Sequence, residues 1–452
     1  MPLETLAQEL VSLILQNVDS PRGLHDLITA SPACLRTFSQ APRLILSAVI
    51  RNAIPAETIR HFLAVLRTPS PSTMSLVSQF LDQYFDVSSS FDFPTTKADV
   101  ISLYQLYNRV TFIITRYLHR LQELGLGESI LISSGSECVR LQRAFLRFEL
   151  YSRLFQVDKT YPWEDPTPNH QFSGVEQFDL FLFHLAPWEV EEMHCVEQYI
   201  SVLVENFVDQ LQEQLIDSVK RCPGIVWTLS SESRQAVDMK EKEEGNGKCN
   251  RENLRAFEAL ELTGLTLFSR NVENYSPAHI SYMTSLGLDF IYDLCISEGR
   301  RSGLIRSNSP HTREFLPEAL RHSPPWIRVP EGVYRQPKWG AEDDPHHHNL
   351  SWHLYRMDPN YGAIYVRPLN CDYSALRQLG YVFWDSGRIQ SSEVFERLES
   401  ARKGMLDCGH FGRRRRERLE DRLKGVRLPI DQFQEIERKF GYITRPLPEG
   451  ED

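Results

Sequence analysis

The sequence of 452 residues carries a formal net charge of −10, with 41% hydrophobic and 24% charged residues, a composition typical of one or two soluble globular domains. The acidic balance argues against general binding to nucleic acid or anionic membranes, and no apolar run is long enough to span a bilayer. The first residues lack the basic start and apolar core of a signal peptide, and the eight cysteines form no C-x-x-C pair, so we expect a cytoplasmic or nuclear protein with reduced thiols.

The first forty residues predict three short helices. Thr5 and Gln8 fit a capping box at the start of the first helix. Ser20-Pro21 and Ser31-Pro32 are start signals for the next two, because serine caps a helix and proline fits its first position. The apolar residues recur at helical spacing within each segment: Leu6, Leu10, Leu13, Ile14 and Val18, then Leu24, Leu27 and Ile28, then Leu35 and Phe38. Helices this short must bury these residues against neighbours or a partner.

This pattern resembles the F-box, the module by which substrate receptors dock on the Skp-type adaptor of cullin ubiquitin ligases. The residues that match its opening helix and Leu-rich second helix are Leu6, Glu9, Leu10, Ile14, Leu15, Leu24 and Leu27. Ala7 stands where the family prefers proline, and Leu35 and Phe38 stand where a tryptophan is common. The resemblance implies that the matching residues bind the adaptor. The alternative is an ordinary three-helix cap on a larger helical domain.

Helical spacing continues through the next hundred residues. Start signals and apolar periodicity predict helices from Pro42 to about Ile50, over 55–66, 74–85 and 96–125, and over 136–155. Thr96 is the expected cap of the longest of these, and Gly125 its left-handed stop. Arg140, Arg143 and Arg147 step by three and four along the 136–155 helix, and we expect them to form a solvated edge paired with nearby glutamates.

The second half of the chain is less regular. A long amphipathic helix is predicted over 188–219, with Glu189, Glu191 and Glu192 complementing its dipole. Residues 230–255 have the charge and glycine content of a linker. Further helices are predicted over 254–267, 277–298 and 432–441, with 299–344 irregular and 373–384 apolar. Residues 225–229 and 363–366 are candidate strands, too few for a sheet-based domain, so the predicted class is all-α.

Three downstream stretches resemble a recurring group of filamentous-fungal F-box-like proteins without an assigned activity. They are RLQRAFLRFELYSRLF at 140–155, PWEVEEMHCVEQYI at 187–200 and LRQLGYVFWD at 376–385. This resemblance spans most of the chain and implies no chemistry. Read from their residues alone, all three stretches are amphipathic or buried helices, and we expect the aromatic group Tyr381, Phe383 and Trp384 to lie in the core.

No catalytic or metal site is predicted. His346, His347, His348 and His353 lie near Asp343 and Asp344, but their spacing fits no known metal-ligand pattern. His194 and Cys195 are adjacent on a helix and therefore point in different directions. Ser133 to Ser136 is expected to form a turn with an N-cap. The basic run Arg413, Arg414, Arg415 and Arg416 is a nuclear-import signal or an anion-binding patch, or else it is part of an exposed helix paired with its own acidic residues.

The sequence thus predicts an F-box-like module over 1–45, a helical body over 46–229, a linker over 230–255, and a second helical segment over 256–452 packed on the first. The expected function is that of a non-catalytic substrate receptor without cofactors, which docks on a Skp-type adaptor and cullin ligase and presents an unknown protein substrate. The alternative is a helical scaffold with no role in ubiquitin transfer. An F-box should leave the surface of Leu6, Leu10 and Ile14 uncovered, whereas a scaffold should bury it against residues after Ala41.

Overall fold

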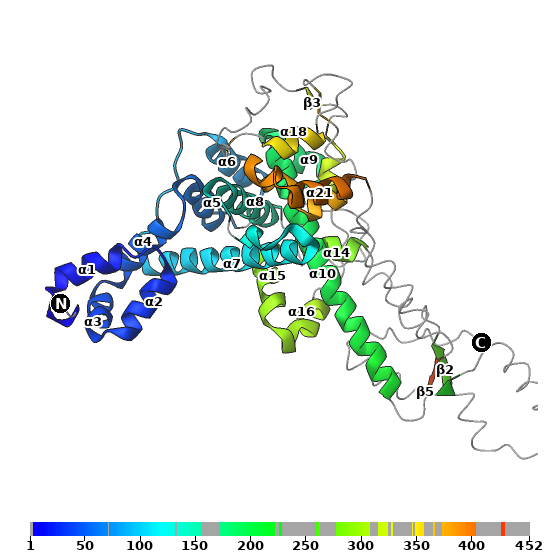
Figure 1. The fold of residues 1–452 in the computed structure, drawn as a ribbon, viewed down its shortest axis with the longest axis horizontal. Coiled ribbons are helices and arrows are strands. Elements are labelled where there is room, and N and C mark those ends of the chain that lie inside the picture. The colour runs from blue at the N-terminus through cyan, green and yellow to red at the C-terminus, as the bar shows by residue number, and fades with distance from the viewer. Residues whose placement is uncertain are drawn as a thin grey trace, which may run out of the picture. The chain divides into compact units, whose positions relative to one another are not determined.

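The computed structural model describes residues 3–70, 72–131, 133–155, 172–221, 277–307, 315–323, 349–356 and 373–403, with residue 346 and the short segments 226–227, 259–262, 327–328, 365–366 and 426–429. Helices dominate these residues, and the predicted all-α class is confirmed (Figure 1). The predictions for residues 230–255 and 432–441 and for the run Arg413–Arg416 lie outside the described residues.

Three short helices follow one another at the N-terminus, and a fourth packs against them. They are α1 (Gln8–Gln16), α2 (Pro21–Ala30), α3 (Pro32–Gln40) and α4 (Pro42–Ala53), preceded by a 3-10 turn at Leu3–Thr5. Ser20 and Ser31 cap α2 and α3 as predicted. The capping box of Thr5 and Gln8 is wrong: α1 begins after Ala7 and has no side-chain cap, because Thr5 belongs to the preceding turn. The predicted module boundary at residue 45 falls inside α4.

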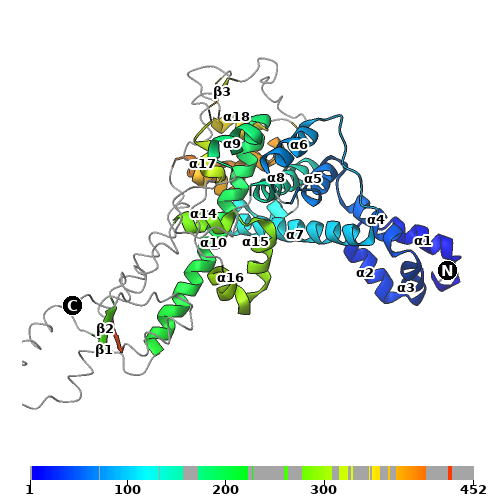
Figure 2. The ribbon, with the colours of Figure 1, turned by 180° about the vertical axis from the view of Figure 1, so that it is seen from behind.

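The helices of the body follow in chain order. The first group is α5 (Ala56–Leu66), α6 (Met74–Phe85), α7 (Lys97–Leu121) with a π turn at Gln122–Leu126 and a 3-10 turn at Glu128–Leu131, and α8 (Gly135–Leu154). The second group is α9 (Gly174–Leu180), a 3-10 turn at Leu182–His184, and α10 (Pro187–Arg221). Thr96 caps α7 as predicted, and Gly125 adopts the predicted left-handed conformation, at a φ of +87°, within the π turn that follows the end of α7 at Leu121. α7 runs from α4 to α5 and α8, which pack against it (Figures 1 and 2).

The later helices are short and interspersed with short strands. They are α14 (Pro277–Thr284), α15 (Gly287–Ile296), a 3-10 turn at Glu298–Arg300, α16 (Arg301–Ser307), α17 (Leu316–Leu320), α18 (Leu350–Arg356), α19 (Ser374–Gln378), a 3-10 turn at Tyr381–Phe383, α20 (Ser386–Ile389) and α21 (Ser392–Arg402). Antiparallel strands pair as β1 (Val226–Trp227) and β2 (Ala259–Leu262) with β5 (Val426–Pro429), and as β3 (Ile327–Arg328) with β4 (Tyr365–Val366).

Three local predictions in this half are wrong. Residues 259–262, expected in a helix, form β2, whose backbone pairs with β5. The single helix expected over 277–298 is divided into α14 and α15, because Gly287 at the start of α15 has a φ of +86°. The stretch 299–344, expected to be irregular, contains α16 and α17. The candidate strands at 225–229 and 363–366 are confirmed at β1 and β4. No helix among the described residues is both long enough and apolar enough to cross a membrane.

The chain folds into two compact units that the predicted boundaries do not follow. The first unit comprises Met1–Tyr199, Ser285–Tyr292 and Glu314–Asp407, and the second comprises Ile200–Thr284, Asp293–Arg313 and Cys408–Asp452. The N-terminal helices and the segment with α19–α21 therefore share one unit, and α10 contributes residues to both. The division at residue 229 does not appear, because side chains of α8 and α10 pair with residues far along the chain.

Candidate docking surface

The N-terminal helices share one small hydrophobic core. Its buried members are Val11, Leu15, Leu24, Cys34, Ile45 and Val49, with Leu6, Val18, Leu27, Ile28, Phe38 and Leu46 partly buried around it. Val11 and Leu15 are four residues apart on α1 and so point to the same side. Ile45 and Val49 give α4 an equal share of this core. The core therefore belongs to four helices and uses one face of α1.

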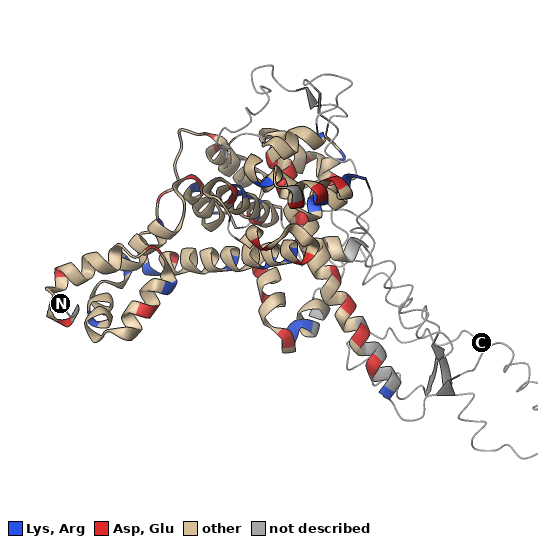
Figure 3. Cartoon of the chain, in the orientation of Figure 1, with Lys and Arg blue, Asp and Glu red and all other residues tan. Residues whose placement is uncertain are grey.

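A second apolar face of α1 remains in solvent. Leu10, Leu13 and Ile14 are 50%, 54% and 38% exposed, and they lie at the i, i+3 and i+4 positions of one helical stripe. The stripe adjoins the buried face, so the apolar arc of α1 is wider than the face that the core covers. α1 carries one charged residue, Glu9, in its first turn (Figure 3). A continuous apolar stripe in water with little charge is typical of an interaction surface.

The predicted adaptor-binding residues are divided between these two faces. Glu9, Leu10 and Ile14 are exposed, and Leu15 and Leu24 are buried. Leu6 and Leu27 are partly buried at the edge of the core. Leu13, which the motif match did not include, is the most exposed of the three apolar residues on the stripe. The helical spacing alone could have added Leu13 to the predicted set.

Hydrogen bonds attach these helices to the rest of the unit. Asn52 of α4 donates its Nδ2 to the carbonyl oxygens of Gln16 at 2.8 Å and Val18 at 3.1 Å, where α1 ends. Arg43 Nη1 donates to the Thr95 carbonyl oxygen at 2.6 Å, just before α7. The open carbonyl of Gln16, at the C-terminal end of α1, is thereby satisfied inside the module, and the exposed stripe is held on a fixed support.

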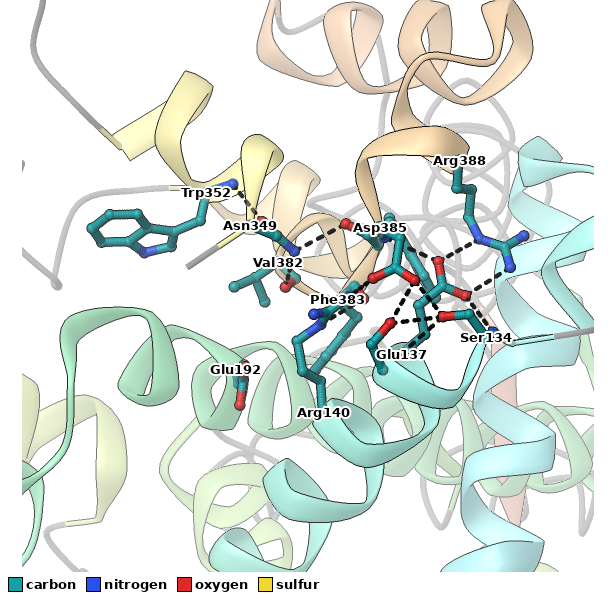
Figure 4. A network of polar contacts seen from close by, with 12 residues as sticks. Ser134, Glu137, Arg140, Glu192, Asn349, Trp352, Val382, Phe383, Asp385 and Arg388 are labelled. Atoms are coloured by element: carbon teal, nitrogen blue, oxygen red, sulfur yellow. Dashed lines mark hydrogen bonds and ion pairs between the residues drawn. The ribbon is translucent and has the colours of Figure 1, made fainter. Parts of the chain in front are cut away.

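A second group of residues that sequence reasoning misjudged lies in the interior of the same unit. Arg140, Arg143 and Arg147, expected at a solvated edge, are buried on α8. Arg140 Nε donates to the Phe383 carbonyl oxygen at 3.0 Å, and its Nη2 donates to Asp385 Oδ1 (Figure 4). Glu137 accepts from Arg388 at both oxygens, at 2.8 and 2.7 Å. These contacts join α8 to residues about 250 positions later.

The middle of α8 is paired with the start of α10. Arg143 holds Glu192 through two hydrogen bonds, from Nε at 3.1 Å and from Nη2 at 2.6 Å. Arg147 Nη1 lies 2.8 Å from Glu189 Oε1. Burial disfavours the charged form of both glutamates: it raises the pKa of Glu192, whereas at Glu189 the guanidinium groups of Arg147 and Arg143 outweigh burial and lower the pKa.

Glu191 extends this cluster toward α19. Its Oε1 accepts from Arg377 Nε at 2.8 Å and from the Tyr381 hydroxyl at 3.0 Å, and Arg356 Nη2 lies 3.7 Å from its Oε2. Burial alone would raise the pKa of Glu191, but Arg377 and Arg356 outweigh it and lower the pKa to about 2. Of the three glutamates expected to complement the helix dipole, Glu189 lies in the first turn of α10 and accepts from the Ala186 N–H at 3.0 Å, whereas Glu191 and Glu192 lie beyond that turn, fully buried and paired with arginine.

A signal for this burial was present in the sequence. The apolar residues of 135–154 occur on every side of the helix: Val139, Leu141, Ala144, Phe145, Leu146, Phe148, Leu150, Tyr151 and Leu154. A helix that is apolar all round is buried, so its arginines had to be buried with it and needed acidic partners. The identity of those partners could not be read from the sequence, because they lie on other elements.

The other residues considered for a catalytic or metal site, among those that the structure describes, have structural roles. His194 and Cys195 are both buried. Burial lowers the pKa of His194 well below its usual range and raises the pKa of the Cys195 thiol, so both are neutral. The predicted core position of Tyr381, Phe383 and Trp384 is confirmed, and Ser134 caps α8. Among the described residues, no group of three or more His, Cys, Asp or Glu side chains is placed to hold a metal ion.

No known protein family, curated protein or solved structure matches this chain. The assignment of a function therefore rests on the residues and geometry described above.

Proposed function

We propose that this protein is a non-catalytic substrate receptor that docks on a Skp-type adaptor of a cullin ubiquitin ligase and presents a protein substrate to it. The exposed stripe of Leu10, Leu13 and Ile14 would be the adaptor-binding surface, with Glu9 beside it. The observation that carries the proposal is the exposure of this stripe on a helix whose opposite apolar residues, Val11 and Leu15, are buried.

Two further features support this proposal. The exposed residues include Leu10 and Ile14, two of the positions at which the sequence resembles an F-box. The buried residues Leu15 and Leu24 hold the helices in place, so that the exposed stripe is presented without any rearrangement of the core. A preorganised apolar surface binds a partner at a lower entropic cost than a surface that must form on binding.

Capture of a Skp-type adaptor by the tagged full-length protein tests the proposal. We expect the adaptor to copurify with the wild type, and Leu10→Asp/Ile14→Asp to abolish capture by placing two charges in an apolar contact. Leu76→Asp/Ile101→Asp is the matched control, because both residues are half-exposed apolar side chains on body helices, and it should capture the adaptor as the wild type does. Absence of the adaptor from all three samples would contradict the proposal.

A helical scaffold without a role in ubiquitin transfer is the second candidate. The observation that favours it is the core shared with α4, since Ile45 and Val49 bury residues of α1 and α2 that resemble an F-box. A scaffold needs no adaptor, and Leu10→Asp/Ile14→Asp should then leave all of its copurifying partners unchanged.

We further infer that the protein works in the cytoplasm or the nucleus, with Arg413–Arg416 as an import signal. A fluorescent fusion in which these four arginines are replaced by alanine should lose nuclear accumulation. The same fusion with Arg300 and Arg301 replaced by alanine is the control, since these arginines lie outside the basic run. Equal nuclear signal from all three fusions would show that the basic run has no role in import.

A further inference from the structure

The ion-pair cluster at the start of α8 has two serine hydroxyls at its surface end. Ser134 Oγ and Ser136 Oγ both donate to Asp385 Oδ2, the second at 2.6 Å. Asp385 Oδ1 accepts from Arg140 Nη2 on the inner side (Figure 4). The Asp385 carboxylate therefore bridges two surface hydroxyls and a buried guanidinium group.

The side chains that Asp385 bridges differ in their solvent exposure. Ser134 is exposed and Ser136 is half-buried, whereas the Arg140 side chain is 1% exposed. Arg140 also has a buried N–H donor to spare, because its Nη1 has no hydrogen-bond partner among the described residues. An anionic group added at the surface serine would thus meet a guanidinium that is shielded from water and still able to donate.

We propose that Ser134 is a phosphorylation site whose modification releases α20 from α8 and loosens α21, which packs on α20. In the transfer, Ser134 Oγ attacks the γ-phosphorus of a nucleoside triphosphate bound to a protein kinase. The new Oγ–P bond forms as the bond from that phosphorus to the bridging oxygen breaks. The nucleoside diphosphate leaves, and the hydroxyl proton passes to a base of the kinase.

The phosphoryl group and the Asp385 carboxylate compete for one position. Phosphorylated Ser134 Oγ has no proton to donate to Asp385, and a phosphate charge of about −2 repels the carboxylate. The phosphate is itself well placed, because Ser134 is the N-cap of a twenty-residue helix and anions are stabilised at helix N-termini. The modification therefore keeps α8 intact and displaces Asp385.

Loss of Asp385 from this position would free more than one side chain. The backbone N–H of Asp385 donates to Glu137 Oε1 at 3.0 Å, and Arg388 pairs with the same glutamate. Asp385 directly precedes α20, so its displacement pulls the first turn of α20 away from Glu137. We expect α20 to lose its attachment to α8, and α21, which packs on α20, to lose that support with it.

Phosphoserine placed at position 134 of the full-length chain by genetic encoding tests this consequence. Backbone amides of α20 and α21 should exchange with deuterium roughly tenfold faster than in the unmodified protein, while those of α8 keep their rates. Phosphoserine at Ser173 is the matched control: Ser173 also closes a capping box, with Glu176, and its hydroxyl bonds stay within that box. Phosphoserine 173 should leave α20 and α21 unchanged.

Unchanged exchange of α20 and α21 with phosphoserine 134, or equal acceleration by phosphoserine 173, would overturn the proposed release. The modification itself is tested by incubating the purified full-length protein with an extract of cells that express it and with adenosine γ-thiotriphosphate. A thiophosphate on Ser134, located by peptide mass spectrometry, is the expected result. Labelling confined to other residues would overturn the assignment of Ser134 as the site.

Discussion

Arg143 shows how this protein accommodates a charge in its interior. Its guanidinium donates from Nε and Nη2 to the two carboxylate oxygens of Glu192, and both side chains are 1% exposed. Transfer of two ions from water to the protein interior costs free energy, and a well-aligned ion pair only offsets that cost. The pair therefore fixes how α8 and α10 fit together more than it adds net stability.

Removal of one partner of this pair should be far more harmful than removal of both. Arg143→Met leaves Glu192 buried without a counterion, and we expect the free energy of unfolding to fall by about 3–5 kcal/mol. Arg143→Met/Glu192→Leu should recover most of that loss. Arg120→Met is the control, because its pair with Glu123 is largely exposed and worth less than about 1 kcal/mol. Urea denaturation measures all three, and equal losses for Arg143→Met and Arg120→Met would contradict this account.

Glu191 should make the stability of the fold depend on acid. Its pKa is about 2 in the folded protein against an ordinary value of 4.5, because Arg377 and Arg356 outweigh the effect of burial. The ionised carboxylate therefore stabilises the fold above pH 4.5, and this contribution is lost as the pH falls from 4.5 toward 2. Between these pH values the unfolding free energy should fall more steeply for the wild type than for Glu191→Gln. Parallel curves would show that Glu191 is not the group responsible.

Some features of the helices could be predicted from the sequence, and others could not. Ser20, Ser31 and Thr96 cap the helices that they were expected to cap, because a cap depends on bonds within a few residues. The partner of Arg140 could not be identified, because Asp385 lies 245 residues away. Apolar spacing on α1 identified the stripe of Leu10, Leu13 and Ile14 but not the buried Val11, and which face is buried depends on α4. Local sequence signals thus predicted where several helices begin, whereas the burial and partners of their side chains depend on contacts with distant residues.

The two faces of α1 should respond differently to truncation. Leu15 is 0% exposed, so Leu15→Ala opens a cavity and should cost about 2–5 kcal/mol of unfolding free energy. Leu10 is half exposed, and Leu10→Ala should change stability by less than about 0.5 kcal/mol. Thermal and urea denaturation of the two variants compare these losses. A large loss with Leu10→Ala would mean that its face is covered in solution, which would also remove the surface proposed for docking.

At the scale of the whole molecule, the first unit is assembled from chain segments that are far apart. Arg356, Arg377 and Arg388 supply the charges that neutralise Glu191 and Glu137 on α10 and α8. Leu288 donates its backbone N–H to the buried Glu149 at 2.5 Å, and Asp289 pairs with Arg109 and Arg153. The segments 285–292 and 314–407 are thus part of the same unit as the N-terminal helices.

The predicted domain boundary at residue 229 implies that residues 1–229 can fold alone. We expect instead that this fragment does not fold. It would keep Glu137, Arg140 and Glu191 without their partners, each costing several kcal/mol when buried alone. We expect no cooperative unfolding transition and weak near-ultraviolet circular dichroism. Coexpression with a fragment of residues 256–452 should restore both signals. A cooperative transition in the isolated 1–229 fragment would show that these pairs are dispensable.

The separation of Arg140 and Asp385 in the sequence also sets a delay during synthesis, because Arg140 is made before its counterion. The ribosome adds about 5–20 residues each second, and 245 residues separate the two, so the nascent α8 waits roughly 10–50 s for its counterion. Throughout that interval its arginines and aromatic side chains are open to chaperones. Translation pauses in the intervening stretch should therefore raise the share of newly made protein that holdases bind.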